Sequence, residues 1–223
     1  MSEETFLQQE KDQLRARLCK YTRKAYQILP KLDKPRILDI GCGSGVPTME
    51  LARLSQGEIV GIDIDQLSLD RFARKIELAG LSHRVKIVKC SMVDMELPEE
   101  SFDIIWAEGS IATIGFKEGL KKWKKFLKSN GLLVIHDGTE NITQKLDQIT
   151  ICGYELIDYF ILPDDAWWAD YYRPLEMKIE ELRAKHTNDP QALLILDREQ
   201  KEIDMYKKNP NQYGSAFFIM QKK

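Results

Sequence analysis

The feature that most constrains the fold of this chain is a set of glycines at alternating positions, Gly41, Gly43 and Gly45, directly after a short apolar stretch. That stretch, residues 35–40, has the length and composition of a buried strand, and a helical pattern starts near Pro47. Glycine accepts a positive φ and has no Cβ atom, so the loop can turn tightly and let a ligand lie against bare backbone. The run therefore predicts a strand, a ligand-binding turn and a helix, in that order.

Two acidic residues accompany this turn. Asp39 precedes the first glycine, and Asp63 ends the next apolar strand, residues 58–63. A carboxylate at the end of the second strand of a βαβ unit suits the two hydroxyls of a ribose, which dinucleotides and S-adenosylmethionine both carry. The third glycine comes one residue earlier than in a dinucleotide fingerprint, and Asp39 suits an ammonium group better than a pyrophosphate. These details favour S-adenosylmethionine as the ligand.

With these residues, the chain resembles the class I, Rossmann-like S-adenosylmethionine-dependent methyltransferases of the small-molecule type. The segment from Ser91 to Asp103 resembles the third cofactor segment of that family and the lead into its fourth strand, and residues 131–136 resemble its fifth strand. The resemblance implies S-adenosyl-L-methionine as methyl donor, S-adenosyl-L-homocysteine as product, and methyl transfer by in-line displacement.

Strand and helix patterns alternate along the chain, which indicates an α/β fold built from parallel βαβ units with right-handed crossovers. Strands are expected at 35–40, 58–63, 85–90, 102–107, 131–136, 154–162 and 214–221. Helices are expected at 3–29, 46–55, 66–80, 117–129, 142–151, 174–186 and 190–208. The resemblance implies a seven-stranded sheet of order 3-2-1-4-5-7-6, with an antiparallel last strand and helices on both faces. We expect a single domain over 1–223, with an N-terminal helical cap (1–30) and a helical insertion between the sixth and seventh strands (163–212).

The resemblance also assigns cofactor contacts. Asp39 is expected near the methionine ammonium, and Asp63 should accept charge-assisted hydrogen bonds from the ribose hydroxyls. Ser91 stands where many relatives have an aspartate that accepts from the adenine amino group, so its hydroxyl is a weaker acceptor. Arg23 either meets the methionine carboxylate from a helix folded over the cofactor or is a solvated arginine. The expected cofactor residues are Asp39, Gly41, Cys42, Gly43, Gly45, Asp63, Ile64, Ser91, Met92, Glu108 and Arg23.

Candidate catalytic residues follow the later strands. Glu108 ends the fourth strand, whose end faces the transferring methyl group in the family. His136 ends the fifth strand and is a candidate general base, because its unperturbed pKa lies near neutrality. A purely structural histidine is the alternative. No Asn/Asp-Pro-Pro-Tyr/Phe run follows the fourth strand, which argues against methylation of the exocyclic amine of adenine or of glutamine.

Four large aromatic residues occur within six positions early in the insertion. They are Trp167, Trp168, Tyr171 and Tyr172. The ligand of such a sheet lies outside the carboxyl ends of the parallel strands, where this segment begins. The four residues are therefore expected either to wall the acceptor pocket or to pack the two inserted helices onto the sheet.

The composition of the chain argues against nucleic acid, a membrane or a metal ion as a partner. The net charge of −2 gives no global basic field for nucleic acid, and no apolar run reaches the ~18 to 20 residues that span a bilayer. The four cysteines are scattered and there are three histidines, so we expect reduced thiols, no metal site and a cytoplasmic location. The expected partner is a small-molecule acceptor, with a monomer or homodimer left open. Alternatives are a protein or tRNA methyltransferase, or a cofactor-binding protein without transferase activity.

Overall fold

The computed structural model describes residues 3–223. Within them seven strands form one sheet of order β3-β2-β1-β4-β5-β7-β6, and β7 is antiparallel to both of its neighbours. The predicted strand order is therefore confirmed. The strands are β1 (Ile37–Ile40), β2 (Ile59–Asp63), β3 (Val85–Lys89), β4 (Phe102–Glu108), β5 (Leu127–Gly138), β6 (Tyr154–Ile161) and β7 (Ser215–Lys222).

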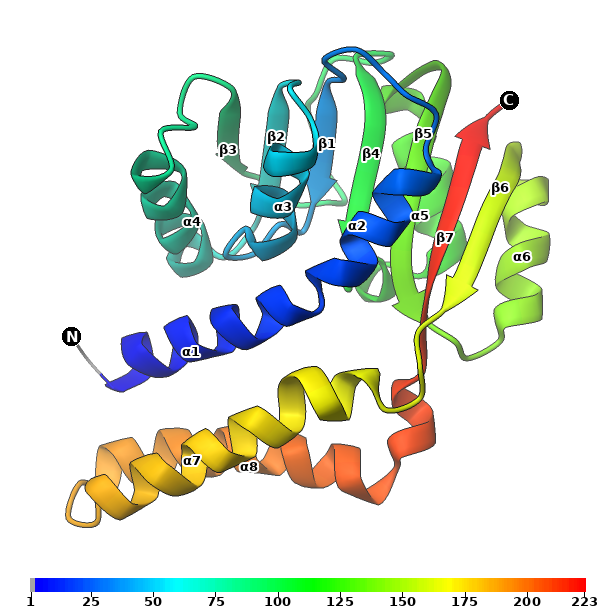
Figure 1. Cartoon of the computed structure of the whole chain (residues 1–223). Helices are drawn as coiled ribbons and strands as arrows, with labels where there is room; N and C mark the ends of the chain where they lie inside the picture. The colour runs from blue at the N-terminus through cyan, green and yellow to red at the C-terminus, as the bar shows by residue number, and fades with distance from the viewer. Residues whose placement is uncertain (1–2) are drawn as a thin grey trace.

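Helices cover both faces of the sheet (Figure 1). One face is covered by α2 (Cys19–Ile28), α3 (Val46–Leu54) and α4 (Gln66–Leu78), and the other by α5 (Phe116–Trp123) and α6 (Ile142–Ile151). Successive strand residues point to opposite faces. In β4, accordingly, Trp106 joins the core under α2 to α4, while Ile105 and Ala107 join the core under α5 and α6.

The N-terminal region differs from the single helix expected over 3–29. It consists of α1 (Glu3–Arg17) and α2, separated at Leu18. The two helices face different cores, because Leu14 and Leu18 enter a third core while Ala25 packs on the sheet. The break lets α1 leave the sheet and extend below it (Figure 1).

The insertion between β6 and β7 forms a second helical layer. It contains a π-helical turn (Trp168–Tyr172), α7 (Arg173–Lys185) and α8 (Pro190–Lys208), so its aromatic segment is helical rather than the expected loop. Figure 1 shows α7 and α8 beneath the carboxyl ends of the parallel strands, with α1 between them and the sheet. The third core joins these three helices, and Leu7, Ile179 and Ile203 are among its buried members.

The helix expected over 117–129 is shorter in the structure. It ends at Trp123 and is followed by a 3-10 turn, Lys124–Phe126. Leu127 then already pairs with Phe102 of β4, so β5 begins four residues earlier than expected. Of the helices within residues 3–223, none is long and apolar enough to cross a membrane.

Candidate functional site

The glycine loop joins β1 to α3 at the carboxyl edge of the sheet. The N–H groups of Gly41 and Cys42 donate to the carbonyl of Ile62, at 2.8 and 3.0 Å, which ties the loop to the end of β2. The N–H of Gly43 donates to the Asp63 carboxylate at 2.7 Å. The structure thus brings together the glycines and the second acid that the sequence singled out.

The glycines have different roles. Gly45 has a φ of +77°, and a Cβ atom there would lie 2.1 Å from the Phe72 ring, so its absence allows α4 to pack closely. Gly43 has a φ of +52°, and a Cβ atom there would meet nothing within 4 Å, so its bare backbone faces open space. Cys42 is buried between this loop and β2, where burial raises the pKa of its thiol. Of these, Gly43 is the position where a ligand can reach the backbone.

Asp39 is a buried carboxylate with a single described side-chain donor. Its side chain is 2% exposed and accepts a hydrogen bond from the Thr48 hydroxyl at 2.5 Å. Burial is the main cause that raises the pKa of Asp39 to about 7; the Thr48 hydrogen bond opposes the shift, and the charges of Glu108 and Asp63 add to it. Because burial and like charges both disfavour the ionised form, this position favours a ligand that carries positive charge.

A cavity of about 170 Å³ lies between α1 and the glycine loop. Asp39, Glu108, Asp12 and Arg15 line it together with residues of the loop. The Asp12 carboxylate accepts from the Ser44 hydroxyl at 2.6 Å and pairs with Lys75 at 2.7 Å. Helix α1 therefore covers the site directly.

The ribose and adenine residues predicted from the sequence lie along the next part of the edge. Asp63 also accepts from the N–H of Asp65 at 2.9 Å. Ile64 is 69% exposed, so it offers an apolar surface that a planar base can cover. The Ser91 hydroxyl accepts from the N–H of Val93 at 3.3 Å, and the side chain of Met92 reaches toward Gly41. A hydrogen-bonding carboxylate beside exposed aliphatic surface fits a nucleoside.

Glu108 and His136 are in-register neighbours on β4 and β5. Glu108 accepts from Thr22 at 2.9 Å and from the Trp106 indole at 2.8 Å. Burial raises the pKa of Glu108, while the positive charge of Arg15 opposes that shift. These contacts fix the carboxylate of Glu108 at the wall of the cavity.

His136 lies deeper than Glu108. It is 5% exposed, its ring stacks on Phe217 with the ring centres 4.6 Å apart, and neither ring nitrogen has a hydrogen-bond partner among residues 6–223, whose side chains the structure describes. Burial, reinforced by the charge of Arg15, lowers the pKa of His136 to about 3. The imidazole is therefore neutral at physiological pH and holds one donor and one acceptor nitrogen.

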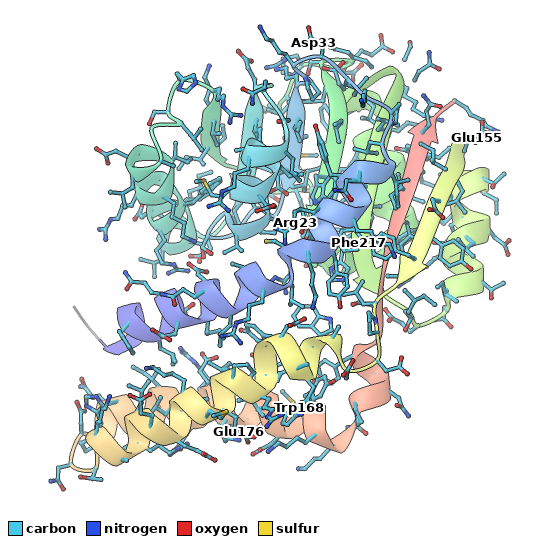
Figure 2. All side chains as sticks on the ribbon, viewed as in Figure 1. Arg23, Asp33, Glu155, Trp168, Glu176 and Phe217 are labelled. Atoms are coloured by element: carbon cyan, nitrogen blue, oxygen red, sulfur yellow. The ribbon has the colours of Figure 1, made fainter. Side chains whose placement is uncertain are left out.

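The arginine that reaches the cavity is Arg15, which the sequence reasoning did not select. Arg23 lies on α2 (Figure 2) and pairs with Glu50 at 2.8 Å, with 45% of its side chain exposed. Arg15 instead lines the cavity, with its guanidinium 4.7 Å from the centre of the Trp167 ring. Arg15 and Asp12 carry no sequence motif, and only the path of α1 places them here.

The four aromatic residues all pack in or against the third core. Trp168 stacks on Tyr206 of α8 at 5.8 Å, in the lower helical layer (Figure 2), and Tyr171 and Tyr172 are buried in the third core. Trp167 lies 6.2 Å from His136, and its indole N–H donates to the Ser215 hydroxyl at 3.0 Å. Trp168, Tyr171 and Tyr172 therefore pack in the lower helical layer, while Trp167 also lies beside His136.

Comparison with known proteins identifies the family. A family model described as a methyltransferase domain matches residues 31–178, more than half of the chain. The chain therefore belongs to this methyltransferase domain family, and its fold is that of the class I, Rossmann-like S-adenosylmethionine-dependent methyltransferases. The family predicted from the sequence is thus confirmed, and S-adenosylmethionine is the cofactor of this class.

Individual relatives are more distant. The sterol 24-C-methyltransferase of Aspergillus fumigatus is 29% identical over 46% of this chain and 27% of its own length. The ubiquinone biosynthesis O-methyltransferase of Bradyrhizobium diazoefficiens is 29% identical over 74% of this chain and 63% of its own length. The chain thus spans less than two thirds of either relative. A SAM-dependent methyltransferase from Geobacter sulfurreducens, solved with S-adenosyl-L-homocysteine, is 16% identical with a TM-score of 0.75, covering 91% of this chain and 90% of that one. This last likeness concerns the fold.

Proposed function

We propose that this protein transfers a methyl group from S-adenosylmethionine to a small-molecule acceptor. The observation that carries the proposal is the covered cavity, which the buried Asp39, the half-buried Glu108 and Arg15 of α1 line together. Helix α1 and the inserted layer lie over the carboxyl edge of the sheet (Figure 1). A covered site of this kind supports a small acceptor over a protein or a tRNA.

The described residues fit the cofactor as follows. The carboxylate of Asp39 binds the methionine ammonium, which would relieve the charge repulsion around it. Asp63 keeps its orientation through the N–H groups of Gly43 and Asp65 and accepts from the ribose hydroxyls. Ile64, which is 69% exposed, would pack on the adenine, and Ser91 and Met92 would hold the base along the same edge.

The proposed mechanism needs little acid–base chemistry. When bound, the cofactor supplies a methyl group already activated by its sulfonium. The protein contributes by holding acceptor and donor at near-attack distance, which can account for much of the rate acceleration. Where the nucleophile arrives protonated, the neutral ring of His136 is the candidate proton acceptor, and Glu108 orients the acceptor or the methionine end of the cofactor.

The relatives support a small acceptor without naming it. Their names refer to a sterol and to ubiquinone biosynthesis, and both concern small molecules. The chain's net charge of −2 gives no support to a tRNA substrate. We further propose that residues 1–223 act as one domain in the cytoplasm.

A metabolite screen tests the proposal. The full chain is incubated with S-adenosylmethionine and pools of small metabolites, and release of S-adenosylhomocysteine is measured, with Asp39→Asn as the control for the cofactor site. We expect at least one small acceptor to give turnover that the variant loses. Turnover only with tRNA or protein extracts would favour the first alternative, and cofactor binding without turnover on any pool would favour the second.

A further inference from the structure

Arg15 has no anionic partner within the described part of the chain. Among residues 6–223, whose side chains the structure describes, no carboxylate lies within ion-pair distance of its guanidinium and no hydrogen bond joins it, although Arg15 is half-buried. One face of the group lies on the Trp167 ring. Stacking on an indole leaves the N–H edges of a guanidinium available for an oxyanion. The charge of Arg15 acts on the Glu108 carboxylate in the same cavity, but no ion pair holds its guanidinium, so its N–H edges remain available to an oxyanion of a ligand.

Arg15 lines the same cavity as Asp39 and the glycine loop, but its guanidinium also lies near the strands on the other side of β1 from β2. Asp12, one turn earlier in α1, contacts Ser44 of the glycine loop, on the cofactor side. Arg15 lies near the other strands, because a Cβ atom added at Gly109, after β4, would be 3.8 Å from its Nη2 atom. Trp167, on whose ring Arg15 lies, donates a hydrogen bond to the hydroxyl of Ser215 at the start of β7. In the sheet order, β4 and β7 lie on the opposite side of β1 from β2, which carries Asp63.

A second polar side chain without a partner lies in the same corner. His136 is 5% exposed and stacks near Trp167, and both of its ring nitrogens are without hydrogen-bond partners in the described structure. Buried polar atoms are rarely left unpaired unless a ligand or water completes them. Arg15 and His136 therefore both lie close to the Trp167 ring, and of the two only Arg15 lines the cavity.

We infer that the acceptor carries an oxyanion, a carboxylate or a phosphate, which Arg15 binds against the face of Trp167. This inference rests on the proposed function and specifies its substrate class. The oxyanion at Arg15 would orient the acceptor so that its nucleophile lies toward the end of β4 and His136. Arg15 is then a specificity-determining residue, because a neutral acceptor of the same shape leaves its charge unpaired.

The test uses matched probes on the full chain saturated with S-adenosylhomocysteine. Benzoate and phenyl phosphate are titrated by calorimetry beside benzyl alcohol, which has a similar shape and no charge. A charge-assisted contact should make the anions bind about tenfold or more tightly than the alcohol. Arg15→Gln should abolish that preference and Arg15→Lys should retain part of it. Arg17→Gln, an exposed position at the end of the same helix, should leave it unchanged.

Two binding results would overturn the inference. One is equal or undetectable binding of all three probes to the wild-type chain. The other is an Arg15→Gln variant that keeps the anion preference but binds S-adenosylhomocysteine more weakly and 5′-methylthioadenosine normally, because only the former has a carboxylate. A different result would contradict the proposed function and leave the inference on Arg15 intact. That result is a preference for anionic probes without methyl transfer to any small molecule. Methyl transfer to a neutral acceptor, with the same kcat/KM in the wild-type chain and in Arg15→Gln, would contradict only the inference on Arg15.

Discussion

At the scale of single residues, the site contains ionisable side chains whose burial disfavours the charged form. Burial raises the pKa of Asp39 to about 7, whereas an unperturbed aspartate titrates near 3.8. Between these two values the folded protein holds a proton that the unfolded chain has released. The stability of the ligand-free protein therefore falls as the pH rises through this window. A cation bound at Asp39 would reverse that penalty, so stability and cofactor binding are coupled at one side chain.

Asp39→Asn should consequently make the protein more stable but worse at binding. The asparagine keeps an acceptor for the Thr48 hydroxyl and removes the buried charge, so we expect a gain on the order of a few kcal/mol at pH 8. Loss of a charge-assisted contact worth about 1.5 to 3 kcal/mol should weaken S-adenosylmethionine binding roughly 10- to 100-fold. Urea unfolding and calorimetry measure the two effects. The exposed Asp33→Asn is the control, and unchanged affinity in Asp39→Asn would contradict the role assigned to Asp39.

His136 should make the stability of the protein depend on pH in the opposite direction from Asp39. Its pKa is lowered to about 3 in the folded protein, against 6.5 for a free imidazole, so the unfolded chain binds the extra proton in this range. The free energy of unfolding should fall by on the order of 1 kcal/mol per pH unit below about pH 6. His136→Gln should remove this slope, whereas the exposed His83→Gln should keep it. Urea unfolding between pH 4 and 8 checks the comparison, and identical slopes in both variants would refute the burial argument.

At the scale of elements, the glycine loop separates a binding role from a packing role. Gly43→Ala forces a left-handed alanine into open space, which costs about 1 to 2 kcal/mol and places a methyl group where the ligand approaches. Gly45→Ala adds a collision with Phe72, and such overpacking costs about 1 to 3 kcal/mol more. Unfolding curves should therefore show the larger loss for Gly45→Ala. Calorimetry should show that Gly43→Ala loses more cofactor affinity, relative to its loss of stability, than Gly45→Ala does. The reverse order would contradict a binding role for Gly43 and a packing role for Gly45.

The elements also show what the sequence could predict. The strands that hold the cofactor residues have local signals, since short apolar runs end in acids or glycines such as Asp39 and Asp63. The break at Leu18 has no such signal, because its cause is the third core formed with residues more than 150 positions away. Helical periodicity alone therefore joined α1 and α2 wrongly. The family resemblance, in turn, indicated Arg23 on α2, and no signal in the sequence indicated Arg15 on α1.

At the scale of the whole molecule, α1 connects the two layers. Lys11 pairs with the buried Glu199 of α8 at 2.6 Å. On the next residue, Asp12 pairs with Lys75 of α4 at 2.7 Å. The apolar side of α1 packs in the third core, and its polar side covers the cavity. The cofactor edge of the sheet and the inserted helices therefore meet through this one helix.

This arrangement predicts how ligand binding spreads through the molecule. A ligand in the cavity would contact the glycine loop and α1 together, and binding to the folded state suppresses the local openings that expose amides to exchange. We expect S-adenosylhomocysteine to slow amide hydrogen exchange in α1 and in Trp168–Tyr172, while α5 and α6 on the opposite face keep their rates. Asp39→Asn at the same ligand concentration should lose most of the protection. Protection confined to the glycine loop and β2, with α1 unchanged, would mean that α1 does not cover the bound ligand.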